Sequence, residues 1–270
     1  MAQHTPTTKT EWTEAGEAWG RRATDWAYLF EHYARAANEL VFDRLGVSAG
    51  ARLLDIACGS GLAANCASRR GAVVSGLDAS EALVCIARAR TPHGDFRVGD
   101  MFALPFPDAS FDVATSFNGI WKGCETAFEE ARRVLTPSGR IGLTFWGRLD
   151  HLGLMPYFLK VIELSPPSHG EASVRQGDTG RPGVIEDILT STGFQPCERG
   201  AVTVVNEWPD ADVAVRALAA AGPSAPAIDA VGVDAFCDAL REALEPMHVP
   251  GVGIRITSEL GWITAELDPR

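Results

Sequence analysis

The stretch that decides the fold is Leu53-Leu54-Asp55-Ile56-Ala57-Cys58-Gly59-Ser60-Gly61-Leu62-Ala63-Ala64. A short apolar run ends on an acid, and the chain then turns through two glycines into alanine-rich sequence. This pattern predicts a buried strand, a tight loop and the start of a helix. That junction is where an α/β sheet holds a nucleotide-like ligand.

Strands and helices alternate on both sides of this stretch. We expect strands over residues 52–56, 72–77, 95–98, 111–117 and 140–146. Helices are expected after Gly61 and over residues 80–90 and 126–135, with a turn at 136–139. Alternation of this kind predicts a parallel sheet covered by helices on both faces.

The two ends of the chain differ from this core. Residues 11–45 have a helical pattern with a break near Gly16 and Gly20, and large side chains recur there every seven residues, which would place them on one helix face. They are Trp12, Trp19, Trp26, Tyr33 and Leu40. After residue 147 we expect helices over 154–164 and 182–192, two more within 210–247, and strands over 202–208 and 253–267. The expected organisation is one domain with a helical cap (1–45), a ligand-binding core (46–147) and a substrate-shaping part that completes the sheet (148–270).

Composition narrows the class of ligand. The chain has 270 residues, and its 24 Lys and Arg against 35 Asp and Glu give a net charge of −11. Nucleic acid is therefore an unlikely partner, because phosphate backbones need concentrated positive charge. The six cysteines form no C-x-x-C pair, which favours free thiols in a reducing compartment. With no signal peptide and no membrane span evident, we expect a cytoplasmic protein that acts on a neutral, apolar or cationic small molecule, and a homodimer is left open.

Three acids identify the ligand more closely. The glycine spacing also fits a dinucleotide loop, but Asp55 would repel a pyrophosphate and would favour a ligand with an ammonium group. Asp78 and Asp100 end the next two expected strands, where carboxylates can accept hydrogen bonds from ribose hydroxyls and an adenine amino group. S-adenosylmethionine has an ammonium, a sulfonium and no phosphate, so it fits this set.

The ordered motifs resemble the class I S-adenosylmethionine-dependent methyltransferases, of the small-molecule type related to ubiquinone/menaquinone methyltransferases. The resemblance covers about residues 50–147 and rests on residues 53–61, 76–80, 99–106, 111–114 and 133–140. It implies a Rossmann-like seven-stranded, mostly parallel sheet with strand seven antiparallel, and S-adenosylhomocysteine as product, with no metal. The usual third glycine is absent, and Cys58 stands where glycine is common.

The resemblance also implies cofactor contacts at specific positions. Ala57, Gly59 and Gly61 would touch the methionine part, Asp78 the ribose, and Asp100 with Met101 the adenine. Phe117 would lie near the sulfonium. The full set of expected cofactor-binding residues is Asp55, Ala57, Gly59, Gly61, Asp78, Ala79, Asp100, Met101, Phe102 and Phe117.

Methyl transfer from a sulfonium is an in-line displacement, so the protein mainly positions the two reactants. The acceptor should lie beyond the fourth and fifth strands, where His151 is a candidate base and Asn118 could orient a hydroxyl. Expected substrate-binding residues are Trp26, Tyr28, Tyr33, Trp121 and Trp146. We predict methyl transfer to a small aromatic or apolar molecule, with oxygen favoured over carbon or nitrogen. Three alternatives stay open: the same fold and cofactor performing cyclisation or decarboxylation, a non-catalytic S-adenosylmethionine-binding subunit, and an NAD-dependent oxidoreductase.

Overall fold

The computed structural model describes residues 9–167 and 178–268. Their strands form one sheet in the order β3-β2-β1-β4-β5-β8-β6, with β7 paired to β8. The strands are β1 (Arg52–Ile56), β2 (Val73–Asp78), β3 (Asp95–Val98), β4 (Phe111–Phe117), β5 (Leu135–Trp146), β6 (Phe194–Trp208), β7 (His248–Val249) and β8 (Gly253–Leu267).

The sheet is parallel from β3 to β5. β8 is the reversed strand, because it runs antiparallel to both β5 and β6. The expected mostly parallel Rossmann-like sheet is therefore confirmed. The expected seven strands lie in its continuous order, and β7 is a two-residue addition at its edge.

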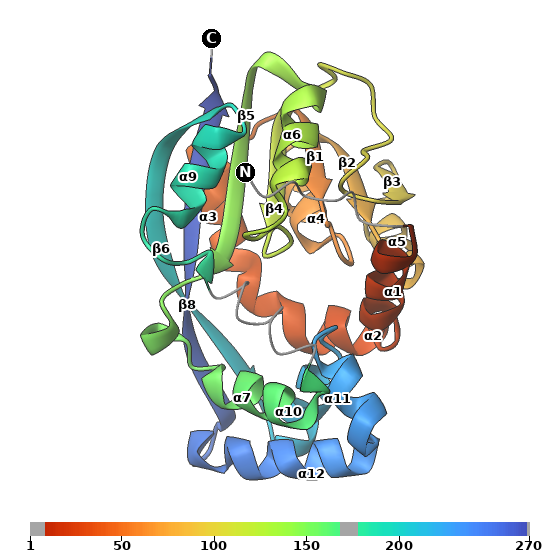
Figure 1. Ribbon diagram of the computed structural model, residues 1–270, viewed down its shortest axis with the longest axis vertical. Helices are drawn as coiled ribbons and strands as arrows, with labels where there is room; N and C mark the ends of the chain where they lie inside the picture. The colour runs from red at the N-terminus through yellow and green to blue at the C-terminus, as the bar shows by residue number, and fades with distance from the viewer. Residues whose placement is uncertain (1–8, 168–177, 269–270) are drawn as a thin grey trace.

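Helices cover both faces of the sheet (Figure 1). On one face α3 (Arg35–Leu45), α4 (Leu62–Arg69) and α5 (Glu81–Arg90) share a hydrophobic cluster with β1 and β2. On the other face α6 (Glu125–Val134) and α9 (Val184–Ser191) share a second cluster with side chains of β1, β4, β5 and β8. The alternation of side chains along each strand explains how Leu53 and Leu54 enter different clusters.

A third hydrophobic cluster lies beyond the carboxyl ends of the parallel strands, in the lower part of Figure 1. It contains α7 (Met155–Leu164), α10 (Ala211–Leu218), α11 (Ser224–Val231), α12 (Val233–Leu244) and the lower halves of β6 and β8. We call this group of helices the lobe. Phe30 and Tyr33 of the N-terminal segment belong to the same cluster, so the cap and the lobe share one core.

The N-terminal segment is more broken than the heptad spacing predicts. α1 (Lys9–Gly20) ends at the expected glycine, and α2 (Ala23–Asp25) is followed by a π-helix (Trp26–Phe30) and a 3-10 helix (Glu31–Ala34) before α3. The five large residues therefore do not lie on one continuous helix face. The irregular part accommodates a buried acid, Glu31, whose carboxylate has to reach partners on other elements.

Other differences from the expected elements are local. β5 begins at Leu135, and the expected turn is an exposed bulge within it, since Phe111 pairs with Leu135 while Val113 already pairs with Arg140. Residues 210–247 hold three helices rather than two. Short 3-10 turns at Leu149–His151 and Glu245–Met247 complete the described elements. None of these helices is both long and apolar enough to cross a membrane.

Candidate cofactor and active site

Two buried carboxylates lie side by side where β1 and β2 end. The Thr115 hydroxyl of β4 donates to Asp55 Oδ1 at 2.8 Å. Burial raises the pKa of Asp55 to about 7, the Thr115 hydrogen bond opposes this, and the charge of Asp78 adds to it. Neither acid forms an ion pair with any residue that the structure describes. Two buried acids without a counter-cation make a site that attracts positive charge.

Asp78 also orders the glycine loop. Its Oδ2 accepts the backbone N–H of Gly59 at 2.8 Å, and its Oδ1 accepts that of Ser80 at 2.9 Å. Burial raises the pKa of Asp78, while these backbone donors oppose the shift. The carboxylate therefore fixes the loop that follows β1 and also the start of α5.

The loop itself has a backbone that few side chains tolerate. Gly61 has a φ of +76°, and a Cβ there would lie 2.8 Å from that of Ala87, so the loop can pass this close to α5 only as glycine. Ala57 has a φ of +57° without being glycine. Strained positions of this kind concentrate at ligand sites.

The adenine side of the expected site follows β3. Asp100 accepts the backbone N–H of Phe102 at 2.9 Å, which closes a turn, and the Gly99 N–H donates to the carbonyl of Asp78 at 3.0 Å. Met101 and Phe102 are partly buried against the core. Asp55, Asp78 and Asp100 are thus gathered at one edge of the sheet.

The N-terminal cap lies against this edge. Gly16 of α1 contacts the Ala79 carbonyl at the end of β2, too closely for any side chain. The Trp26 indole nitrogen lies 3.9 Å from the position that a Cβ on Gly59 would occupy. Trp26 therefore lies next to the glycine loop.

A buried ionic network that sequence reasoning missed ties the cap to the loop. Glu31 forms an ion pair with Arg90 and accepts a hydrogen bond from the Ser60 hydroxyl. Arg90 also donates to Ser60 Oγ at 2.7 Å and to the Ala27 carbonyl at 2.8 Å. The one available signal was an acid within an otherwise apolar helical face.

On the acceptor side, Asn118 and Tyr33 meet just beyond β4. Asn118 Nδ2 donates to the Tyr33 hydroxyl at 3.3 Å, while Asn118 Oδ1 is buried with no partner among the described residues. Burial raises the pKa of Tyr33, so the phenol stays neutral. Its ring stacks on Trp146 with centroids 5.8 Å apart.

A small cavity of about 20 Å³ opens between these groups and the loop after β4. It is lined by Asn118, Ile120, Trp121, Phe145, Trp146 and Thr179. The Asn118 amide and the Thr179 hydroxyl are polar groups within walls that are otherwise mainly apolar.

Three further expected residues have contacts outside this cavity. His151 is half exposed on the 3-10 turn after β5, with Nδ1 3.2 Å from Glu259 Oε2. Tyr28 is 59% exposed, and its ring lies under the Arg90 guanidinium rather than in the aromatic cluster. Phe117 packs edge-on against Phe42 of α3, with centroids 5.4 Å apart. No group of acids, histidines or cysteines suited to a metal ion occurs among residues 9–167 and 178–268.

Comparison with known proteins identifies the family. Residues 54–143 match the model of the methyltransferase domain. A demethylmenaquinone methyltransferase from Tropheryma whipplei is 32% identical over 211 residues, which cover 72% of this chain and 85% of the relative. The chain belongs to the S-adenosylmethionine-dependent methyltransferase family.

Two further matches cover different shares of this chain. A Mycolicibacterium smegmatis protein named "Probable S-adenosylmethionine-dependent methyltransferase" is 39% identical over 113 residues, 40% of this chain. This match spans 44% of the length of that relative. The solved structure of the [4+2]-cyclase SpnF has a TM-score of 0.57 at 21% identity and covers 87% of this chain and 82% of its own. At that identity the likeness shows a shared fold.

Proposed function

We propose that the chain binds S-adenosylmethionine and transfers its methyl group to an oxygen of a small aromatic or apolar molecule. The observation that carries the proposal is that Asp55 and Asp78 are both buried beside the glycine loop, and that neither forms an ion pair with a described residue. A cationic donor would supply the missing positive charge, whereas the pyrophosphate of a dinucleotide would add two negative charges to the same place.

The cofactor contacts follow the edge of the sheet. Asp55 holds the ammonium, and the loop from Ala57 to Gly61 lies along the methionine part. Asp78 accepts from the ribose hydroxyls, because each carboxylate oxygen keeps a lone pair beyond those used by Gly59 and Ser80. Ala79, Asp100, Met101 and Phe102 surround the adenine, and Phe117 borders the sulfonium.

The acceptor would enter next to Asn118. The buried Asn118 Oδ1 can accept a hydrogen bond from a substrate hydroxyl, and an aromatic ring would pack between Trp121 and Trp146 once the cavity widens. The name of the Tropheryma whipplei relative supports an aromatic acceptor. The present cavity of about 20 Å³ is smaller than any such molecule, so one wall must move on binding.

The transfer step is a displacement at the methyl carbon. A lone pair of the acceptor oxygen forms the new carbon–oxygen bond, the carbon–sulfur bond breaks, and its electron pair stays on sulfur. The hydroxyl proton leaves to a base, for which His151 remains our candidate. Tyr33, Trp26 and Trp146 position the acceptor and exclude water.

The deciding experiment incubates the full chain with methyl-labelled S-adenosylmethionine and a panel of phenols, quinols and amines. Formation of labelled product and S-adenosylhomocysteine is expected with a phenol or quinol. Spectroscopy of the product then identifies the methylated atom. Cofactor binding with no transfer to any acceptor would favour the alternative of non-methylating chemistry, and tight NAD binding would contradict the proposal.

Asp78→Ala tests the assignment of the cofactor site. Loss of one or two buried hydrogen bonds should weaken S-adenosylmethionine binding by roughly ten- to a hundredfold in calorimetry. Asp112→Ala is the matched control, because that exposed carboxylate also accepts a backbone N–H, from Arg52 at the opposite edge of the sheet. Equal affinities for the two variants would refute the contact.

A further inference from the structure

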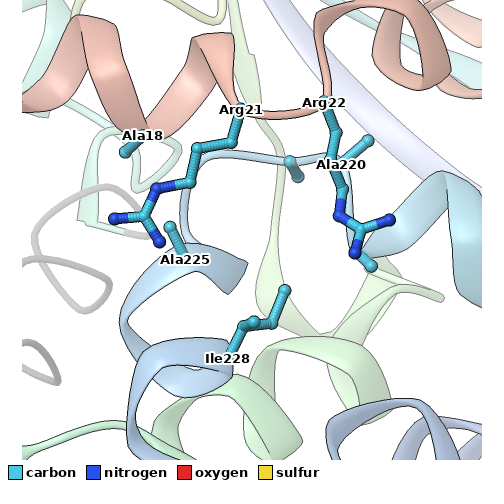
Figure 2. Close-up of a pocket in the computed structure, with 8 residues that line it drawn as sticks. Ala18, Arg21, Arg22, Ala220, Ala225 and Ile228 are labelled. Atoms are coloured by element: carbon cyan, nitrogen blue, oxygen red, sulfur yellow. The ribbon is translucent and has the colours of Figure 1, made fainter. Parts of the chain in front are cut away.

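A second cavity, of about 390 Å³, lies between the cap and the lobe. Figure 2 shows Arg21 and Arg22 extending into it from the turn between α1 and α2. The opposite wall is formed by Ala220, Ala225 and Ile228 of the lobe. None of its lining residues belongs to the site proposed above, so it is a separate place on the molecule.

The charges in this cavity do not cancel. Arg21 pairs with Asp229 at 2.6 Å. Arg22 is half-buried and forms no ion pair with any carboxylate that the structure describes. Burial raises the pKa of the Cys237 thiol, and the charges of Arg22 and Arg241 oppose that shift. One unbalanced guanidinium therefore faces the cavity in a chain whose net charge is −11.

The remaining wall is apolar and made of small side chains. Ala219, Ala220, Ala221 and Ala225 are buried, and their methyl groups leave the space open. Apolar surface of this kind favours the apolar part of a ligand. A guanidinium favours a carboxylate, with which it can form a bidentate pair of hydrogen bonds. A single free positive charge matches a monoanion better than a dianion.

We propose that this cavity binds a small carboxylic acid, whose carboxylate pairs with Arg22 and whose apolar body lies against the alanines. The ligand would bridge the turn of the cap and the start of α11. It would therefore stabilise the contact between the cap and the lobe in addition to occupying the cavity.

Calorimetry on the full chain tests this with octanoate as the probe, and with 1-octanol and inorganic phosphate as comparisons. Octanoate should bind, and 1-octanol and phosphate should bind at least several-fold more weakly. Arg22→Gln should weaken octanoate binding by roughly tenfold or more, because a charge-assisted hydrogen bond is lost. Arg69→Gln is the matched control, since Arg69 is an exposed arginine on α4 that also lacks an ion pair among the described residues.

A second variant, Ala225→Leu, fills the cavity without changing charge and should also weaken octanoate binding while the protein stays folded by circular dichroism. The proposal is overturned if octanoate fails to bind, if 1-octanol binds as tightly, or if Arg22→Gln behaves like Arg69→Gln. Failure here is distinguishable from failure of the proposed function. Arg22→Gln should keep its affinity for S-adenosylmethionine, and Asp78→Ala should keep its affinity for octanoate.

Discussion

Asp55 is a carboxylic acid whose protonation the surrounding fold changes strongly. Burial raises its pKa to about 7, so its charge varies across neutral pH. The ammonium of the cofactor favours the ionised carboxylate, and binding must lower this pKa. Affinity for S-adenosylmethionine should therefore rise with pH, by roughly eightfold between pH 6 and 7.5, where an α-amino group remains largely protonated.

Calorimetry across this range with two variants checks the assignment. Asp55→Asn should bind more weakly and lose the pH dependence, because the amide does not titrate. Thr115→Val removes the hydrogen bond that lowers the pKa of Asp55, so the midpoint should move to higher pH. An unchanged profile in Asp55→Asn would show that another group is responsible.

The acids at the carboxyl ends of the strands were predictable because their signal is local. An acid that ends a strand before two glycines can be identified in sequence, as can the acids that end the next two strands. Thr115 and Glu31 were not predictable in this way. Their partners lie 60 and 29 residues away, and only the packed sheet brings them together.

At the level of elements, the cap is tied to the core by one buried ionic network. Glu31→Gln keeps the shape of the side chain but leaves Arg90 with an uncompensated charge. We expect the free energy of unfolding, measured in urea, to fall by about 3 kcal/mol. S-adenosylmethionine affinity should fall as well, because the single amide oxygen of glutamine cannot accept from both Arg90 and Ser60 of the glycine loop as the two carboxylate oxygens do.

Glu39→Gln is the control for this prediction. Glu39 of α3 pairs with Arg70 at the end of the neighbouring helix α4, and both side chains are partly exposed. Exposed pairs of this kind contribute less than about 1 kcal/mol. If Glu31→Gln cost no more than Glu39→Gln, the network would not anchor the cap.

The shape of the cap could be predicted only in part. Gly20 ends α1 as expected. The aromatic residues of 19–33 do pack together, and the ring centroids of Trp19 and Trp26 lie 4.8 Å apart. The π-helix at Trp26–Phe30 was not predictable, because heptad spacing assumes a regular helix. Two side chains from other elements bind carbonyl groups of this π-helix and change its pitch. Arg90 donates to the Ala27 carbonyl at 2.8 Å, and the Trp208 indole N–H donates to the Leu29 carbonyl at 2.7 Å.

For the whole molecule, the long strands β6 and β8 join the sheet to the lobe, and the cap packs against both (Figure 1). Binding of S-adenosylmethionine at the sheet edge should therefore order the cap. At about a hundred times the dissociation constant, the cofactor should stabilise the protein by about 2.7 kcal/mol.

Hydrogen exchange locates that stabilisation. Protection should increase over residues 11–34 and 57–62, which border the proposed site. α9 is the internal reference, because it packs on the sheet away from the cofactor edge and should change little. Protection confined to α9 and the lobe would place the cofactor elsewhere.

The sequence by itself determined the parallel core, its strand ends and the acids that follow them, because these depend on side-chain periodicity and turns between neighbouring residues. It also determined the family, through motifs in fixed order. Only the tertiary structure decided that Asp55 and Asp78 are buried together with no cationic side chain paired to them among residues 9–167 and 178–268. It likewise decided how Glu31 reaches Arg90 and that Arg22 faces a cavity of the lobe. These features depend on distances between segments far apart in the chain, which packing sets and no local pattern records.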